Sequence, residues 1–231
     1  MIDKTCLLEN IHTHLKDGMT IMVGGFGVPG TPFTLIDALL EVGVSGLTLI
    51  KNEANEDHLG LSRLIEAGRA KILITSHLGL NATVIGMMNR AEIEVEFYPQ
   101  GILAEKIRAG GAGLHGILTD IGIDTILAQN KELTTVNGQR VMIEPALRAD
   151  VALIHAAAAD PFGNLVYEKS ARNFNPAMAT AAGTVIVETE RLAAPGELEP
   201  DAIHTPGGFV DHVVVLDELS ADYGILERHV L

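Results

Sequence analysis

Short apolar runs recur along this chain, and most of them are apolar at every position instead of at alternate positions. A run without polar interruption is typical of a strand that is covered on both faces, as in a parallel sheet. The pattern therefore predicts strands at these runs, most of them covered on both faces. The runs lie at 20–25, 47–52, 71–76, 94–99, 151–157, 184–190 and 212–218.

Segments with helical spacing separate the early runs. The apolar positions within 35–40 share one helix face, and Thr31–Pro32 before them predicts a capping side chain followed by proline at the first helical position. Gly43 predicts the end of this helix. Further helices are predicted near 58–67, 82–90 and 102–109.

Strands that alternate with helices over short connections favour an α/β fold, in which a mostly parallel sheet is flanked by helices. Asn137–Gly138 stands between two β-prone runs and is a strong hairpin signal. It predicts an antiparallel hairpin excursion at 131–144 that interrupts the α/β order. No segment rich in Ser, Pro or Gly resembles a linker, so a single domain over 1–231 is predicted.

The chain is strongly acidic, with a net charge of −14. Because its basic residues are scattered, nucleic acid is excluded as a partner. No membrane-spanning helix and no signal peptide are expected, since the apolar runs are short and the N-terminus carries acids and histidines. The single cysteine, Cys6, excludes an internal disulfide and fits a reducing environment, so a cytoplasmic location is predicted.

The stretch TIMVGGFGVPGTP (20–32) joins the first apolar run to the first helix. Loops at the carboxyl ends of parallel strands are where open α/β folds bind ligands, and helix N-termini present unpaired N–H groups to anions. The loop lacks the Gly-Lys-Ser/Thr of a Walker sequence, and Pro29 interrupts the match of 25–30 to GxGxxG. Two interpretations stay open: a ligand-binding loop, or a turn whose glycines serve packing.

Five segments, in order, resemble the family I coenzyme A (CoA) transferases. They cover nearly the whole chain, which is similar to the alpha subunit of the two-subunit 3-oxoacid, acetate or acetoacetate CoA-transferases. The segments are DGMTIMVGGFGVPGTP (17–32), PQGILAEKIRAGGAG (99–113), EPALRADVALIHA (144–156), DPFGNLVYEKSARNFNPAMA (160–179) and TPGGFVDHV (205–213).

This resemblance implies that CoA is a substrate and not a bound cofactor. It implies ping-pong transfer of CoA between a short-chain acyl-CoA and a carboxylic acid, through a glutamyl-CoA thioester on a glutamate of the beta subunit. The nearest string here to the Ser-Glu-Asn motif of the beta subunit is KNEANED (51–57), which lacks the serine. Glu53 is therefore a poor nucleophile candidate, and 53–57 is predicted to be a solvated acidic loop. The expected assembly is α2β2 or larger, with the beta subunit as partner.

The resemblance also implies the site residues. Gln100 is predicted to support catalysis by donating a hydrogen bond to a substrate carboxylate or thioester oxygen. A structural or interface role is favoured for Asn173 and Asn175, and a helix-end interaction for Arg108. The predicted CoA-binding residues are Gly24, Gly25, Phe26, Gly27, Val28, Pro29 and Gly30.

Two other classes of function stay open, and a metal site is not expected. The histidines show no ligand spacing with Asp, Glu or Cys, so no metal is predicted. A non-catalytic CoA- or nucleotide-binding module would need the same glycine loop without a partner's glutamate. An acyl-CoA hydrolase of related fold would release the thioester without an acceptor acid.

Overall fold

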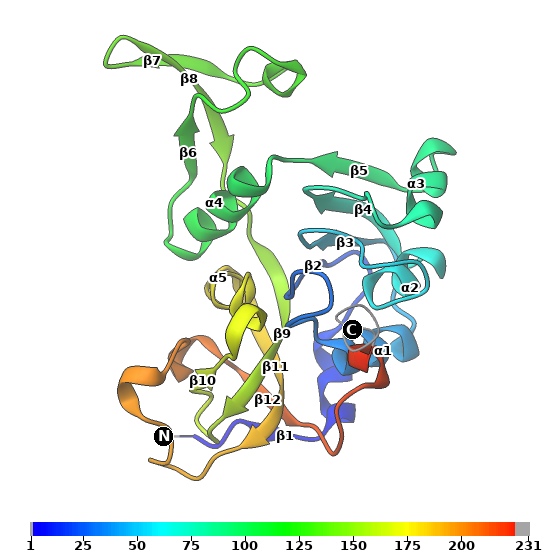
Figure 1. Ribbon diagram of the computed structural model, residues 1–231, viewed down its shortest axis with the longest axis vertical. Coiled ribbons are helices and arrows are strands. Elements are labelled where there is room, and N and C mark those ends of the chain that lie inside the picture. Colours follow the sequence, from blue (N-terminus) through cyan, green and yellow to red (C-terminus); the bar gives the residue numbers. More distant parts are fainter. Residues whose placement is uncertain (1, 225–231) are drawn as a thin grey trace.

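The computed structural model describes residues 2–224. A nine-stranded sheet forms its body, in the order β1-β12-β11-β9-β2-β3-β4-β5, with β10 beside β9 (Figure 1). Every pairing along that path is parallel, and only β10 runs antiparallel. The strands are β1 (Thr5–Cys6), β2 (Thr20–Val23), β3 (Leu47–Ile50), β4 (Ala70–Thr75), β5 (Glu94–Phe97), β9 (Ala149–Ala159), β10 (Leu165–Val166), β11 (Ala182–Leu192) and β12 (His212–Val215).

Helices cover both faces of this sheet (Figure 1). α1 (Phe33–Val42), α2 (Leu61–Glu66) and α3 (Ala82–Asn89) pack on one face, and α4 (Gln100–Gly111) and α5 (Asn175–Thr180) pack on the other. The predicted α/β fold with a mostly parallel sheet is therefore confirmed. Short 3-10 segments complete the chain: η1 (Leu8–His14), η2 (Ile126–Ala128), η3 (Lys169–Arg172), η4 (Pro200–Ala202), η5 (Gly207–Phe209) and η6 (Ala221–Gly224).

The uninterrupted apolar runs follow from this double cover. In β2, Ile21 and Val23 enter the core beneath α1, while Met22 enters the opposite core beneath α4 and α5. Because successive side chains of a strand point to opposite faces, both sets must be apolar when both faces are buried. No helix within 2–224 combines the length and the apolar character that crossing a membrane would require.

The start of α1 differs from the sequence prediction. The helix begins at Phe33, and Thr31 does not cap it, because its hydroxyl donates to the carbonyl of Gly27 at 2.7 Å. The carboxylate of Glu188, on β11, instead accepts from the N–H of Leu35 at 3.0 Å. A long-range carboxylate thus replaces the local cap. The predicted helix end is confirmed, since Gly43 adopts the left-handed conformation there.

The antiparallel excursion is confirmed but is larger than predicted. β7 (Leu133–Val136) and β8 (Gln139–Pro145) form the hairpin, and Asn137 and Gly138 have φ values of 53° and 80°, as a two-residue type I′ turn requires. β6 (Gly116–Thr119), which was not predicted, pairs with β8 to complete a three-stranded sheet. This sheet projects from the main body beyond α4 (Figure 1).

The strand order changes direction at β2. From β2 the chain proceeds outward through β3, β4 and β5, whereas β9 lies on the other side of β2, followed by β11 and β12. In open parallel sheets, the crevice beside such a switch point, at the carboxyl ends of the strands, is the usual ligand site. The glycine loop 24–30 leaves β2 at this point.

Candidate functional site

Segments from four adjacent strands meet at the carboxyl edge of the sheet. The glycine loop 24–30 follows β2, the segment 51–55 follows β3, Ser76 follows β4, and Gln100 begins the helix after β5. The N–H of Gly24 donates to the carbonyl of Leu153 in β9 at 2.9 Å, which anchors the loop to the other side of the switch point. Parallel strands thus bring together residues that are distant in sequence.

The glycine loop is a compact turn with free backbone donors. The N–H of Phe26 donates to the carbonyl of Pro29 at 3.1 Å, and the Phe26 side chain is 47% exposed. Within residues 2–224, the N–H groups of Gly25, Gly27, Val28 and Gly30 form no hydrogen bond. Unpaired backbone donors are costly when buried, so a segment that retains them is suited to a ligand that accepts hydrogen bonds.

Two asparagines hold one side of this loop. Asn173 donates to the carbonyl of Pro29 at 2.9 Å, and Asn175 donates to the carbonyl of Gly30 at 3.0 Å. Asn175 is fully buried, and its side-chain oxygen accepts from the N–H of His155 in β9. The structural role favoured for both residues is therefore present, and it is a clamp on the glycine loop.

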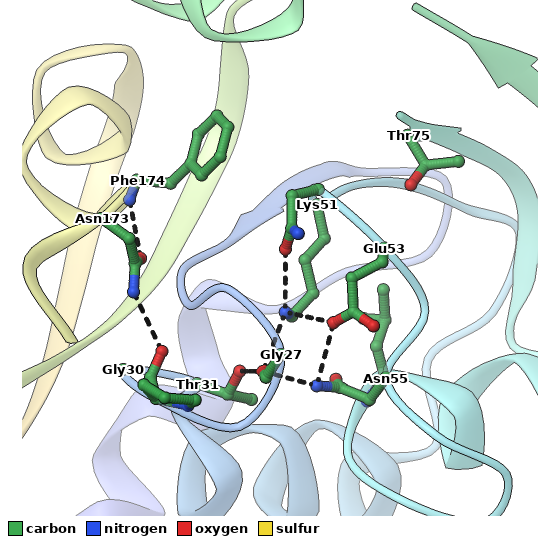
Figure 2. Close-up of polar contacts among 12 residues, drawn as sticks. Gly27, Gly30, Thr31, Lys51, Glu53, Asn55, Thr75, Asn173 and Phe174 are labelled. Carbon is green, nitrogen blue, oxygen red and sulfur yellow. Dashed lines mark hydrogen bonds and ion pairs between the residues drawn. The ribbon is translucent and has the colours of Figure 1, made fainter. Parts of the chain in front are cut away.

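A buried polar cluster holds the other side of the loop (Figure 2). Asn55 donates to the carbonyl of Gly27 at 2.8 Å and to Glu53 Oε1 at 3.3 Å. Lys51 Nζ lies 3.2 Å from Glu53 Oε1 and 3.5 Å from the carbonyl of Gly27. Burial lowers the pKa of Lys51, and the charge of Glu53 opposes that shift.

The prediction of a solvated acidic loop at 53–57 is wrong for its first three residues. Glu53 is 4% exposed and Asn55 is 2% exposed, and only Asp57 at the far end faces solvent. The reason is Lys51, which is fully buried and supplies the opposite charge that allows a carboxylate to leave water. Because two donors already hold the Glu53 carboxylate, its geometry is that of a structural group.

Gln100 is the first residue of α4 and is half-buried. Its side-chain oxygen contacts the hydroxyl of Ser76, which also lies 2.6 Å from the carbonyl of Asn52, and these two acceptors share the one hydroxyl proton. The amide nitrogen of Gln100 makes no hydrogen bond in the described part of the chain, so it is free to donate. Arg108, on the same helix, forms an exposed ion pair with Glu105 at 2.8 Å and does not reach the site.

Residues 6–216 match the family model described as coenzyme A transferase. The chain belongs to the coenzyme A transferase family. The family resemblance read from the sequence is therefore confirmed.

Curated relatives of this coenzyme A transferase chain include proteins named as alpha subunits. It is 48% identical over 212 residues to a protein named as the alpha subunit of a probable coenzyme A transferase from Bacillus subtilis (strain 168), covering 91% of this chain and 93% of that one. It is 46% identical over 218 residues to the alpha subunit of acetate CoA-transferase from Escherichia coli (strain K12), covering 94% and 99%.

A solved structure shares the fold. The apoenzyme of an acyl-CoA transferase from Escherichia coli O157:H7 superposes with a TM-score of 0.84 at 24% identity, over 95% of this chain and 48% of that one. The chain thus spans about half the length of that solved protein. At this identity the likeness shows the fold alone.

A second polar cluster of this coenzyme A transferase chain lies beside the loop's anchor on β9, with His155 and Glu188 buried and Glu190 exposed. His155 Nδ1 is 2.9 Å from Glu188 Oε1, and Nε2 is 3.0 Å from Glu190 Oε1. The ring of Tyr223 packs against the imidazole, with the ring centroids 5.3 Å apart. Burial lowers the pKa of His155, but the two carboxylates outweigh it and the net shift is upward. Burial also raises the pKa of Glu188.

We expect His155→Gln to cost more stability in acid than in alkali. The carboxylates raise the pKa of His155 in the folded chain, so protonation of the imidazole stabilises the fold. This contribution is fully present below about pH 6.5, the ordinary pKa of histidine, and is lost as the pH rises through the folded pKa. The loss in free energy of unfolding should be about 1.5 kcal/mol larger at pH 6 than at pH 9, as for a hydrogen bond to a charged group.

Denaturant unfolding at the two pH values measures this difference. The exposed His115 provides the matched control, because His115→Gln should change the stability equally, and little, at both. A loss for His155→Gln that does not vary with pH would show that the imidazole is not charged in the folded chain.

Sequence reasoning missed Lys51 and Asn55 as residues of the site. The signal was present, because both lie in the segment that follows β3, at the carboxyl end of a parallel strand, where open α/β folds bind ligands. Their proximity to the glycine loop could not be read from the sequence, since it depends on the pairing of β2 with β3. No group of three or more His, Cys, Asp or Glu within 2–224 is arranged to hold a metal ion.

Proposed function

We propose that this chain is the alpha subunit of a two-subunit CoA-transferase that moves CoA between a short-chain acyl-CoA and a carboxylic acid. The observation that carries the proposal is the glycine loop 24–30, which places unpaired backbone N–H groups at the switch point of the sheet. CoA offers phosphate, carbonyl and amide oxygens as acceptors. Family membership and the alpha-subunit names of the relatives support the same role.

The nucleophile of the proposed reaction is a glutamate of the beta subunit. Its carboxylate attacks the acyl-CoA carbonyl, the carbon–sulfur bond breaks, and an acyl-glutamyl anhydride and CoA thiolate form. The thiolate then attacks the glutamyl carbonyl, which releases the first acid and leaves a glutamyl-CoA thioester. The acceptor acid reverses these steps. Glu53 is unsuited to this role because Lys51 and Asn55 already hold its carboxylate.

Gln100 is the residue of this chain proposed to act beside the reacting carbonyl. Its free amide nitrogen can donate to a substrate carboxylate or to the thioester oxygen, while the Ser76 hydroxyl fixes its side-chain oxygen. The glycine loop and the beta subunit together exclude water, because an anhydride or thioester would otherwise hydrolyse. A cytoplasmic α2β2 or larger assembly completes the proposal.

We expect the covalent CoA to appear on the beta subunit and not on this chain. The two proteins are produced together, incubated with acetoacetyl-CoA, and analysed by intact-mass spectrometry; a CoA adduct should appear only on the beta subunit. This chain, purified without its partner, should show no transfer of CoA to succinate or acetate. An adduct on this chain, or full turnover by it alone, would contradict the proposal. Loss of thioester without any acceptor acid would favour a hydrolase.

A further inference from the structure

The segment after β3 is unusual for a loop because it buries a complete ion pair under the glycine loop. Lys51 is fully buried, and its Nζ has Glu53 Oε1 at 3.2 Å, Asn52 Oδ1 at 3.4 Å and the carbonyl of Gly27 at 3.5 Å. Taking two charges out of water is expensive, and an apolar pair of the same volume is commonly no less stable. Stability alone therefore does not account for this pair.

The carbonyl of Gly27 is the point where the cluster meets the loop. It accepts from Asn55 Nδ2 at 2.8 Å and from the hydroxyl of Thr31 at 2.7 Å, with Lys51 Nζ as a third, longer donor. Figure 2 shows these donors converging on Gly27 from the segment after β3 and from the start of α1. One carbonyl with three donors has a fixed direction.

That direction determines where the next N–H points. In a trans peptide the carbonyl oxygen and the following N–H lie on opposite sides of the chain, and the described residues contain no cis peptide. When the Gly27 oxygen faces the cluster, the N–H of Val28 faces away from it, and this N–H is one of the unpaired donors of the loop. Glycines give a loop little rigidity of their own, so its order depends on the contacts around it. Asn173 and Asn175 hold 29–30, and the cluster holds the Gly27 carbonyl.

We propose that Lys51, with Glu53 and Asn55, is a positioning group that fixes the Gly27 carbonyl and so aims the free N–H of Val28, in the glycine loop, at acyl-CoA. The loop itself contains no lysine. Lys51 is buried and contacts the carbonyl of Gly27, and it does not touch the ligand. This inference rests on the proposed function, because it takes from it that the loop binds CoA. The effect of Lys51 on the order of the loop can be tested separately.

The test uses the double variant Lys51→Met/Glu53→Gln in the complex with the beta subunit. Methionine keeps most of the volume of lysine, and glutamine keeps an acceptor for Asn55, so no buried charge is left unpaired. Lys51→Met alone is made as well, to show the effect of the uncompensated carboxylate. The control is Lys106→Met/Glu144→Gln, which removes another buried pair, 2.7 Å apart, on α4 and β8. Glu144 also accepts from the partly exposed Lys131 at 2.8 Å, and glutamine keeps an acceptor for that lysine.

Two readouts separate the order of the loop from the binding of acyl-CoA. Hydrogen exchange of the two hydrogen-bonded loop amides, those of Gly24 and Phe26, reports whether the loop is held. The KM for acyl-CoA, compared with kcat, reports whether an ordered loop is needed for binding. In Lys51→Met/Glu53→Gln we expect exchange of the Gly24 and Phe26 amides to accelerate at least tenfold, and the KM to rise about tenfold with a smaller change in kcat. The control pair should leave both readouts near wild type.

Each other outcome has a definite meaning. Unchanged loop exchange together with an unchanged KM would overturn the positioning role. Equal changes in the control pair would overturn it too, because they would reflect general destabilisation. Faster loop exchange with an unchanged KM would show that Lys51 does order the loop, and would contradict the proposed binding of CoA by the loop.

Discussion

Gly25→Ala is expected to reduce the activity of the assembled enzyme about 100-fold, the loss that follows when a binding segment is displaced by about 1 Å. Gly25 has a φ of 97°, and a Cβ there would lie 2.7 Å from the backbone nitrogen of Thr31 and 2.1 Å from its hydroxyl. Backbone atoms at the start of α1 cannot yield easily, so the loop must move instead.

Gly27→Ala provides the matched control for this substitution. Gly27 also has a positive φ, 62°, but a Cβ there would meet only Pro29 Cδ, at 3.9 Å. Both variants therefore carry the backbone strain of about 1–2 kcal/mol, and only Gly25→Ala adds the clash. Steady-state kinetics should show a loss within about tenfold for Gly27→Ala. Equal losses in the two variants would mean that the position of the loop relative to α1 does not matter for activity.

Asn175→Ala is expected to lower the free energy of unfolding by about 3 kcal/mol or more. Its side chain is fully buried and donates to the carbonyls of Gly30 and Ala171, at 3.0 and 2.9 Å, while accepting from the N–H of His155 at 3.2 Å. Each buried partner left unpaired costs about 1–3 kcal/mol. For a chain of this size the melting temperature should fall by about 10 °C.

Asn173→Ala tests whether burial is the reason. Asn173 also makes three hydrogen bonds, to Pro29, Ser170 and Phe174, but it is half-buried, so water can replace them. Its loss should be about 1 kcal/mol. Thermal unfolding of both variants measures the difference. A fall for Asn173→Ala as large as that for Asn175→Ala would show that the number of bonds, and not burial, sets the stability of the clamp.

The sequence predicted the elements of the fold well because their signals are local. Uninterrupted apolar runs marked the parallel strands, helical spacing marked α1 to α4, and Asn137–Gly138 marked the hairpin. β6 was missed because its partner, β8, lies more than twenty residues further on, and half-buried GILT has neither clear alternation nor an uninterrupted buried pattern.

The errors at the site have a common physical cause. Thr31 was expected to cap α1, and 53–57 was expected to be solvated, because each expectation considered only neighbours in the sequence. In the fold, Glu188 from β11 supplies the acceptor at the helix start. Lys51 pairs with Glu53 beneath the glycine loop 24–30, which follows β2. Long-range partners decide whether a polar side chain is exposed or buried.

The sequence by itself determined the class of fold, the family and the position of the glycine loop, since apolar periodicity and a distinctive glycine and proline spacing lie within short segments. Only the tertiary structure decided what holds that loop: Asn173 and Asn175 on one side, and Lys51, Glu53 and Asn55 on the other. These residues meet because β2 lies between β9 and β3 at the switch point of the sheet. Strand order depends on the whole chain. It decides which polar groups are buried side by side, and buried polar groups must form hydrogen bonds with one another.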